Sequence, residues 1–428
     1  MTKLLRIGII MISGKGWIGG SEYIKNIILA LSSLPHEVRK TFEICLVFSK
    51  SSIDSDTYHQ IEPHLNISYD LDSETNLDNF TNRVVWKIRR DIFKEVNPRM
   101  SDLCKKKGIN FVYPHLASEN EQTSNFQGCS WIADFQHKYL PNFFTKSEIQ
   151  ERNKYFEKIS NVSQRIVLSS KTVATDFQKF FPDSKTKIEV LHFRTSIPKE
   201  WYQRDSVKAQ KKYNLPDRFF LVSNQFWQHK NHGIIFEALR ILKAQSISPI
   251  VVFTGNIYDY RNPDYVDLIL QTIHKNDLTF QTYLLGLIPK EDQMQLMRRA
   301  IAVIQPSLFE GWSTVIEDAR CLGKKMLLSD FEVHLEQDPP NSFFFERNSP
   351  QQLADLIDKH WRDMSETPNL DQEALARSQN IQEVQEFGYQ FLAIANSKQS
   401  GSMTIRWYLE LPLKVLFSKA KRFLKKIN

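Results

Sequence analysis

The chain has 428 residues, of which 41% are hydrophobic and 25% charged, as is typical of a globular protein with two domains. Its four cysteines are scattered without the C-x-x-C spacing of a zinc site, and they do not suggest a disulfide framework. We find no signal peptide and no run of 18 apolar residues, and we therefore expect a protein of the cytoplasm.

The net charge of +7 is concentrated near the C-terminal end. Residues 401–428 contain seven basic side chains and one acid, so they carry +6 and leave the rest of the chain almost neutral. A protein body without excess positive charge argues against nucleic acid as a partner.

Apolar runs alternate with helical patterns along most of the chain, which predicts parallel α/β layers. In the first half the predicted strands are Leu5–Ile12, Phe42–Phe48, Phe111–Tyr113, Ser130–Ala133, Ile166–Ser169 and Ile188–Leu191. In the second half they are Phe219–Ser223, Ile250–Thr254, Gln281–Leu285, Ile301–Ile304 and Lys325–Ser329. The polar stretch 195–218 has no periodicity and is predicted to link two domains.

A glycine-rich loop, Gly14-x-Gly16-x-x-Gly19, follows the first predicted strand and precedes an apolar helix. This pattern is the dinucleotide-binding fingerprint, but a tight turn between a strand and a helix needs the same glycines. An NAD site would also need an acid at the end of the second strand, and that strand runs into Ser49 and Lys50 instead. An NAD-dependent oxidoreductase is therefore kept as an alternative.

Two further loops that follow predicted strands carry polar side chains. Asp134 and His137 lie in an aromatic loop after the strand that ends at Ala133, and a buried structural histidine is the alternative for His137. Lys230 follows the strand Phe219–Ser223, and a solvated lysine is the alternative there.

The segment 306–337 is the most informative. A predicted strand leads into a loop with Glu310, and a helix is predicted from Thr314 to Gly323, where glycine suits the position after a helix C-terminus. A helix N-terminus at the carboxyl edge of a parallel sheet offers its amides to a phosphate. Glu317 lies in the first turn of this helix, although Thr314-x-x-Glu317 also fits a capping box that needs no ligand.

This segment resembles the donor-sugar motif of the retaining glycosyltransferases of family 4 (group 1). The resemblance implies a GT-B fold, in which two Rossmann-like α/β domains face a cleft. The expected organisation is an acceptor domain (1–198), a nucleotide-sugar donor domain (199–380), a helix that crosses back to the first domain (381–400) and the basic tail (401–428). The family separates its two acids by seven residues, whereas Glu310 and Glu317 are separated by six.

The same resemblance assigns site residues. Glu310 would face the sugar, Glu317 would hold the ribose, and Lys230 would hold the diphosphate, with Gln225 at a position where the family has arginine. His137 would lie over the donor sugar and, with Glu310 and Lys230, complete the catalytic set. Further donor contacts are expected at Asn224, Gly286, Leu287, Ile288, Gly311, Trp312, Ser313 and Thr314, and cleft contacts at Gly19, Gly20, Ser21 and Asp134.

No metal and no cofactor are expected. The two D-x-D motifs, 54–56 and 70–72, are predicted to be solvated loops, because Lys230 and helix amides can stabilise a departing diphosphate without Mg²⁺.

Residues 401–428 form a basic amphipathic pattern when they are placed on a helix. One face carries Leu409, Leu413, Leu416, Ala420, Phe423, Leu424 and Ile427. Such a helix suits an anionic membrane surface, and docking on the protein itself is the alternative. We therefore expect a hexosyltransferase-like enzyme on the inner membrane face, with a saccharide or lipid-linked saccharide acceptor in surface polysaccharide or glycolipid synthesis. A catalytically silent protein that binds sugar nucleotides or polyanions is the second alternative.

Overall fold

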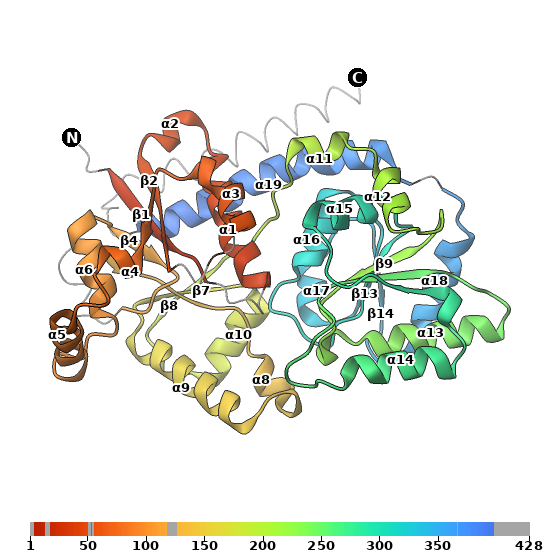
Figure 1. The fold of residues 1–428 in the computed structure, drawn as a ribbon, viewed down its shortest axis with the longest axis horizontal. Coiled ribbons are helices and arrows are strands. Elements are labelled where there is room, and N and C mark those ends of the chain that lie inside the picture. Colours follow the sequence, from red (N-terminus) through yellow and green to blue (C-terminus); the bar gives the residue numbers. More distant parts are fainter. Residues whose placement is uncertain are drawn as a thin grey trace, which may run out of the picture.

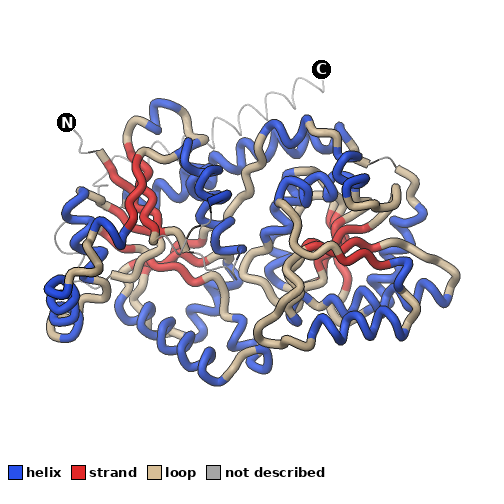
Figure 2. The backbone as a smooth tube through the Cα atoms, viewed as in Figure 1, coloured by secondary structure: helices blue, strands red, loops and turns tan. Residues whose placement is uncertain are grey.

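The computed structural model describes residues 4–12, 18–49, 53, 55–117, 126–365 and 367–397. These residues form two α/β domains built on parallel sheets, as predicted (Figures 1 and 2). The basic tail and the first two glycines of the glycine-rich loop lie outside the described residues.

The first domain contains two sets of parallel strands. One has the order β3 (Ile67–Asp70), β2 (Phe42–Phe48), β1 (Leu5–Ile10), β4 (Phe111–Tyr113) and β5 (Gln127–Gly128). The other has the order β6 (Ser130–Ile132), β7 (Arg165–Leu168) and β8 (Lys187–Val190). Its helices are α1 (Ile18–Ser32), α2 (His36–Arg39), α3 (Ser55–Ile61), α4 (Leu71–Glu74), α5 (Phe80–Asp91), α6 (Pro98–Lys107), α8 (Gln136–Tyr139), α9 (Lys146–Val162) and α10 (Lys171–Phe180).

The second domain is one six-stranded parallel sheet. Its order is β11 (Thr282–Leu284), β10 (Val251–Thr254), β9 (Phe220–Ser223), β12 (Val303–Gln305), β13 (Met326–Ser329) and β14 (Ser342–Phe345). The helices are α11 (Lys199–Gln203), α12 (Ser206–Lys212), α13 (His232–Ala244), α14 (Tyr265–Lys275), α15 (Lys290–Arg299), α16 (Thr314–Cys321), α17 (Glu332–Gln337) and α18 (Pro350–Arg362).

Both faces of this second sheet are buried, which explains why its strands are continuous apolar runs rather than alternating ones. Phe220 and Val222 of β9 pack in the core cluster that includes residues of α13 and α18. Phe219 and Leu221, whose side chains point to the other face, pack in the cluster that includes residues of α15 and α16.

The stretch predicted as an interdomain linker is not an extended segment. Helices α11 and α12 occupy half of it, and Ala209 and Leu215 are buried in the core of the second domain. The guanidinium of Arg298 donates to the carbonyl of Arg204 at 2.7 Å, which fixes the turn between the two helices. These helices are short, so too few turns are available for a periodic apolar pattern to show in the sequence.

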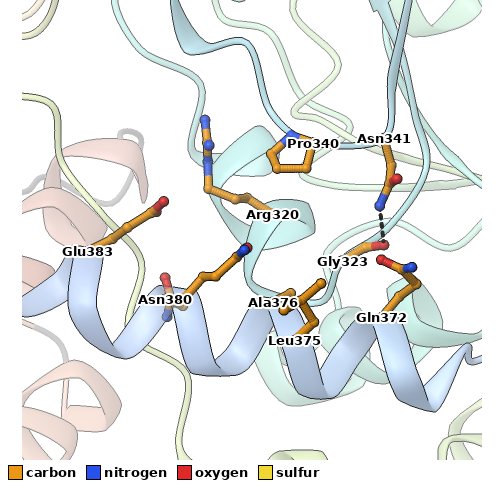
Figure 3. A pocket seen from close by; sticks show the side chains of 10 residues that line it. Arg320, Gly323, Pro340, Asn341, Gln372, Leu375, Ala376, Asn380 and Glu383 are labelled. Atoms are coloured by element: carbon orange, nitrogen blue, oxygen red, sulfur yellow. Dashed lines mark hydrogen bonds between the residues drawn. The ribbon is translucent and has the colours of Figure 1, made fainter. Parts of the chain in front are cut away.

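A single long helix, α19 (Leu370–Asn396), connects the two domains (Figure 1). It packs against α16 of the second domain and α1 of the first. A small pocket of about 120 Å³ lies beside its first half, lined by polar side chains such as Arg320, Asn341 and Asn380 (Figure 3). Farther along, Phe391 packs edge-on against Tyr113 with ring centroids 5.1 Å apart. The helix crosses between the domains without a break, and the expected boundary at residue 380 falls within it.

A second connection between the domains is made by Glu336 of α17. Its carboxylate accepts hydrogen bonds from the backbone amides of Lys171 and Thr172, at 2.6 and 2.9 Å, at the start of α10. It also contacts Nε2 of His192 at 2.7 Å. Burial by itself would raise the pKa of Glu336, but these partners lower it to about 2. An ionised carboxylate therefore joins the second domain to a helix N-terminus of the first.

Candidate functional site

A cavity of about 1000 Å³ lies between the two domains and is lined by residues of both. The second domain contributes residues at the carboxyl ends of β9, β10 and β12, and the first contributes residues after β4 and β6 together with the start of α1. Ligands of parallel α/β sheets bind at this edge, because the strand-to-helix loops that carry functional side chains converge there.

Lys230 and Glu310 lie together in this cavity. The Lys230 ammonium is 2.6 Å from Oε1 of Glu310, and the amide of Gln305 donates to the same oxygen at 3.0 Å. Asn231, with a left-handed φ of 56°, follows Lys230 and donates to the carbonyl of Pro306 at 3.3 Å. That bond ties the lysine loop to the Glu310 loop, so two residues 80 positions apart in sequence face one point.

Gly311 is required by the close approach of the two domains. A Cβ at this position would lie 2.0 Å from the carbonyl oxygen of Ala133 in the first domain, so any residue other than glycine would clash with it. Glycine here lets the Glu310 loop reach the wall formed by the end of β6. Trp312 completes the contact, because its indole Nε1 donates to the carbonyl of Phe193 at 3.2 Å.

Helix α16 begins at Thr314, as predicted, but the residue that caps it is Ser313. The Ser313 hydroxyl accepts from the amide of Ile316 at 3.5 Å, so Ile316 and not Glu317 occupies the third helical position. The capping box that was the alternative for Glu317 is therefore not formed. Thr314 and Val315 line the cavity at the first two helical positions, whose amides have no acceptor within the helix.

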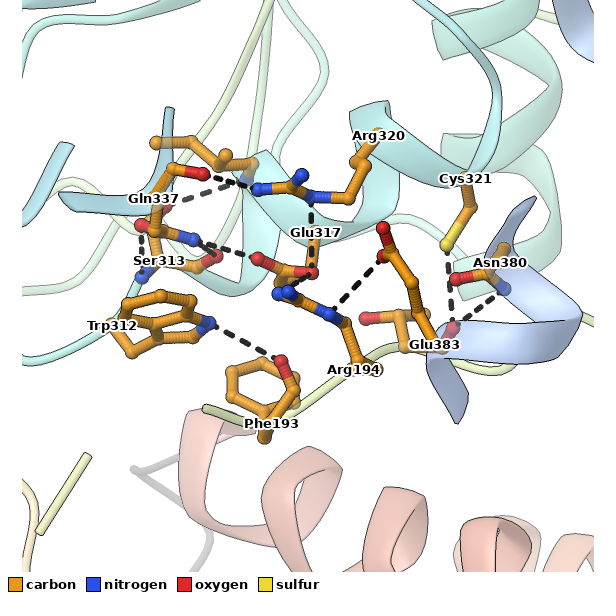
Figure 4. A network of polar contacts seen from close by, with 12 residues as sticks. Phe193, Arg194, Trp312, Ser313, Glu317, Arg320, Cys321, Gln337, Asn380 and Glu383 are labelled. Carbon is orange, nitrogen blue, oxygen red and sulfur yellow. Dashed lines mark hydrogen bonds and ion pairs between the residues drawn. The ribbon is translucent and has the colours of Figure 1, made fainter. Parts of the chain in front are cut away.

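Glu317 is buried in a polar network away from the cavity (Figure 4). One carboxylate oxygen is 3.0 Å from Arg194 and 3.4 Å from Arg320, and the other accepts from the amide of Gln337 at 3.0 Å. The Glu317 side chain is 0% exposed, and Glu317 is not among the described residues that line the cavity. The structure thus assigns it a packing role that the sequence did not predict.

The next residue, Asp318, lines the cavity instead. Residues 311–317 separate it from Glu310, which is the seven-residue spacing of the family that the segment resembles. Its carboxylate forms an ion pair with Lys290 at the start of α15. Burial by itself would lower the pKa of Lys290, but the negative charge of Asp318 raises it above the ordinary value.

Arg261 is a cavity residue that the sequence did not reveal. Its guanidinium lies over the ring of Phe144 in the first domain, 4.3 Å from the centroid, and over Trp227 at 5.1 Å. The neighbouring Tyr260 donates to Glu148 of α9 at 2.9 Å, so the loop after β10 spans the cleft. Its position after a strand at the same sheet edge was the available signal. Arg261 adds a cation to the cavity, which Gln225 also lines.

His137 does not line the cavity. It is 1% exposed in α8, its Nε2 is 3.0 Å from the side-chain oxygen of Asn153, and its ring packs against Phe156. Burial is the main cause that lowers the pKa of His137 below its ordinary value, which favours the neutral ring. The structure supports the buried structural histidine that was the alternative for this position.

The remaining predicted residues divide between the cavity wall and its support. The wall includes Gly19, Asp134, Asn224, Gln225, Leu287, Ile288, Trp312 and Ser313. Gly20 and Ser21 are buried within α1. Gly286, with φ 68°, supports the wall by accepting from the amide of Gly255 at 2.8 Å.

Five aromatic side chains line the first-domain side of the cavity. Tyr23 and Trp131 stack with ring centroids 4.3 Å apart and an interplanar angle of 12°. Phe193 packs edge-on against Tyr23 at 5.9 Å, and Tyr155 and Phe156 also line this side. These rings offer apolar surface of the kind that lines ligand pockets, and charged side chains of the same domain, Glu22, Asp134 and Arg152, line the cavity with them.

Within the described part of the chain, no group of three or more His, Cys, Asp or Glu side chains could hold a metal ion. No described helix is both long and apolar enough to cross a membrane.

Comparison with known proteins connects the second domain to a family. Residues 203–377 match the family model of glycosyl transferases group 1. This segment includes Lys230, Arg261, Glu310 and Asp318. No curated protein sequence matches the chain.

Solved structures that resemble the whole chain share its fold at low sequence identity. The crystal structure of Anabaena Alr3699/HepE in complex with UDP and glucose has a TM-score of 0.63 and 15% identity, covering 92% of this chain and 100% of that one. A glycosyltransferase from Rickettsia africae has a TM-score of 0.65 and 13% identity, with 94% and 100% covered. Sucrose-phosphate synthase from Thermosynechococcus elongatus has a TM-score of 0.60 and 14% identity, with 96% and 100% covered. The fold is therefore GT-B.

Proposed function

We propose that the protein is a retaining glycosyltransferase that moves a hexose from a nucleotide diphosphate-sugar to an acceptor hydroxyl. The observation that carries the proposal is the cavity between the domains, where Lys230, Glu310 and Asp318 converge on one wall. The family match over residues 203–377 supports it, since those three residues lie within the matched segment.

In this proposal the charged wall of the second domain binds the donor. Lys230 and Arg261 contact the diphosphate together with the amides at the start of α16, since a helix N-terminus favours anions. Asp318, rather than Glu317, accepts hydrogen bonds from the ribose hydroxyls. It lines the cavity, and it is separated from Glu310 by seven residues, as the two acids are in the family that the segment resembles. Binding of the donor would displace Lys230 from Glu310 and leave that carboxylate to face the sugar.

The chemistry would need no side-chain base. In the family that the chain resembles, the acceptor attacks the sugar on the face from which the diphosphate leaves, and the leaving phosphate takes the acceptor proton. Lys230 would stabilise the negative charge that develops on that phosphate. Preorganised contacts of this kind usually make the largest single contribution to lowering the activation barrier of an enzyme. We expect no metal requirement, so EDTA should leave the activity unchanged.

The acceptor is proposed to enter from the first-domain side of the cavity, where Tyr23 and Trp131 present ring surface. The proposed acceptor is a saccharide or a lipid-linked saccharide of surface polysaccharide or glycolipid synthesis. Such an acceptor would be accessible to an enzyme that its basic tail holds at the inner membrane face. Among the structures similar to this chain is WaaG, described as a glycosyltransferase involved in lipopolysaccharide biosynthesis, with a TM-score of 0.53.

A thermal-shift panel of UDP-, GDP- and ADP-sugars, followed by assay of sugar transfer, tests the proposal. A ligand at 100 times its Kd adds about 2.7 kcal/mol to the free energy of unfolding, which a melting curve resolves readily. Stabilisation by one nucleotide class with transfer or slow donor hydrolysis is expected. Stabilisation by NADH alone would support an oxidoreductase, and binding without any turnover would support the silent binding protein.

A further inference from the structure

Helix α5 in the first domain has its polar side against the protein and its apolar side in solvent. None of its twelve residues is buried. Phe80 is 72% exposed, and Val84, Val85 and Ile88 are exposed as well, as is Ile92 directly after the helix. With 100° between successive residues, these apolar positions fall within one arc of about 140°. We call this arc the α5 apolar face.

The opposite side of α5 is held to the protein by polar contacts. Arg89 forms ion pairs with Asp102 at 2.6 Å and with Glu95 at 2.8 Å. The indole Nε1 of Trp86 donates to Asp102 at 2.8 Å, and the amide of Asn82 donates to the carbonyl of Thr75 at 3.3 Å. Because these bonds fix the rotation of the helix, the α5 apolar face cannot turn inward without breaking them.

An ordinary surface helix has the reverse arrangement, since burying its apolar stripe is what stabilises it. A contiguous apolar face left in solvent indicates a surface that binds a partner. Figure 1 shows α5 at the outer edge of the first domain, away from the second domain, where a large partner has access.

The charges around the α5 apolar face favour one partner. Residues 77–94 contain five basic side chains and two acids. Arg83, Lys87, Arg90 and Lys94 are exposed, and the first three border the apolar arc on one side. Long basic side chains beside an apolar stripe suit a lipid surface, because the aliphatic stems lie along the acyl boundary while the charges reach the headgroups. A second copy of this chain would bring like charges together.

We propose that α5 lies in the headgroup region of an anionic membrane, with Phe80, Val84, Ile88 and Ile92 entering the acyl boundary. The helix is about 18 Å long, so it lies along the surface and does not cross the bilayer. This surface is separate from the donor site and from residues 401–428, and it does not depend on the proposed transferase activity.

The test compares two triple variants of the full chain. The first changes the α5 face (Phe80→Ser, Ile88→Ser and Ile92→Ser), and the matched control changes exposed apolar residues of the second domain (Leu268→Ser, Leu270→Ser and Phe280→Ser). Sedimentation with phosphatidylglycerol vesicles should show at least tenfold weaker binding for the first variant and no change for the control. Equal binding of both would overturn the proposal. Melting curves verify that both variants remain folded.

Two further measurements separate α5 from other contacts. An environment-sensitive dye on Ile88→Cys should shift to the blue with anionic vesicles, and the four natural cysteines are buried and do not interfere. An unshifted dye would overturn the proposal even if the protein binds. Arg83→Gln with Lys87→Gln should weaken binding roughly fivefold per residue, equivalent to about 1 kcal/mol each. Equal binding to pure phosphatidylcholine vesicles would exclude a role for anionic lipid. If α5 binds an acidic protein instead of lipid, the α5 substitutions should leave vesicle binding unchanged.

Discussion

Glu317 and Asp318 are adjacent in sequence and both are buried, yet only Asp318 lines the cavity. Successive residues of a helix differ by about 100° in direction, so one acid of α16 faces the body of the protein and the other faces the cavity. Arg194, which is 123 positions away from Glu317 in sequence, occupies the inner side and fixes the choice.

These two acids give the first prediction. Asp318→Asn should weaken binding of the donor nucleotide ten- to hundredfold, since loss of charge-assisted hydrogen bonds costs about 1.5–3 kcal/mol. Calorimetric titration with the nucleotide identified by the thermal-shift panel measures this. The matched control is Glu317→Gln, which leaves Arg194 without its buried partner.

For that control we expect nucleotide affinity close to that of the wild type and a free energy of unfolding lower by about 1–3 kcal/mol, since Arg194 keeps its ion pair with Glu383 at 3.2 Å. If Glu317→Gln weakens the nucleotide while Asp318→Asn does not, the assignment of the two acids is reversed.

Lys230 should affect turnover more than donor binding. Removing one preorganised charge contact to a developing anion lowers the rate by about 10²–10³. We therefore expect Lys230→Ala to reduce kcat by that factor with a smaller change in nucleotide Kd. Lys212→Ala is the matched control, because Lys212 pairs with Asp292 on the outside of the same domain. A Lys230→Ala enzyme with near-normal kcat would contradict the proposed role.

At the scale of elements, α17 and α10 are joined across the domains by one carboxylate. The pKa of Glu336 is lowered from an ordinary value of 4.5 to about 2, so the folded protein binds fewer protons there than the unfolded chain between these pH values. The stability that this contact contributes is therefore complete above about pH 4.5 and is lost as the pH falls toward 2.

Glu336→Gln should remove this contribution. At neutral pH we expect a free energy of unfolding lower by about 1.5–3 kcal/mol, and a shallower loss of stability between pH 4.5 and 2 than in the wild type. Denaturant titrations at several pH values measure both. Glu332→Gln on the same helix serves as the control, since its side chain is 60% exposed and its partner Arg347 is 3.5 Å away. Identical pH profiles for Glu336→Gln and the wild type would refute the role of this contact.

At the scale of the whole molecule, two features place the two walls of the cavity opposite each other. Helix α19 runs from α16 to α1 without a break, and the Glu310 loop touches the first domain at Gly311. The proposed membrane surfaces, α5 and residues 401–428, belong to the first domain and to the segment that follows α19.

Deleting residues 401–428 tests the second of these surfaces. The truncated protein should bind anionic vesicles more weakly and keep its nucleotide affinity, since every donor residue lies before this segment. The part of binding that the segment contributes should fall with salt, as the screening length shrinks from about 10 Å at 0.1 M to about 3 Å at 1 M. Unchanged vesicle binding would exclude a membrane role for residues 401–428. Unfolding of the truncated protein would mean that these residues pack in the globular core.

The strand order along the chain followed from local sequence. Buried parallel strands are uninterrupted apolar runs, so all eleven predicted strands could be located within two residues, and the Glu310 loop with the helix after it could be identified as a motif. The strands that escaped prediction, β3, β5 and β14, are short or lie at sheet edges, where burial on fewer sides leaves a weaker apolar pattern.

Which side chain faces the cavity was decided by tertiary contacts. Asp318 and not Glu317 reaches the cleft because Arg194 holds Glu317 inside, and His137 is withdrawn because Asn153 and Phe156 enclose it. Arg261 reaches the cavity because aromatic rings of both domains hold it there. Sequence periodicity determines elements because local burial repeats along the chain, but the direction of a single side chain depends on partners far away in sequence, which only the folded structure brings together.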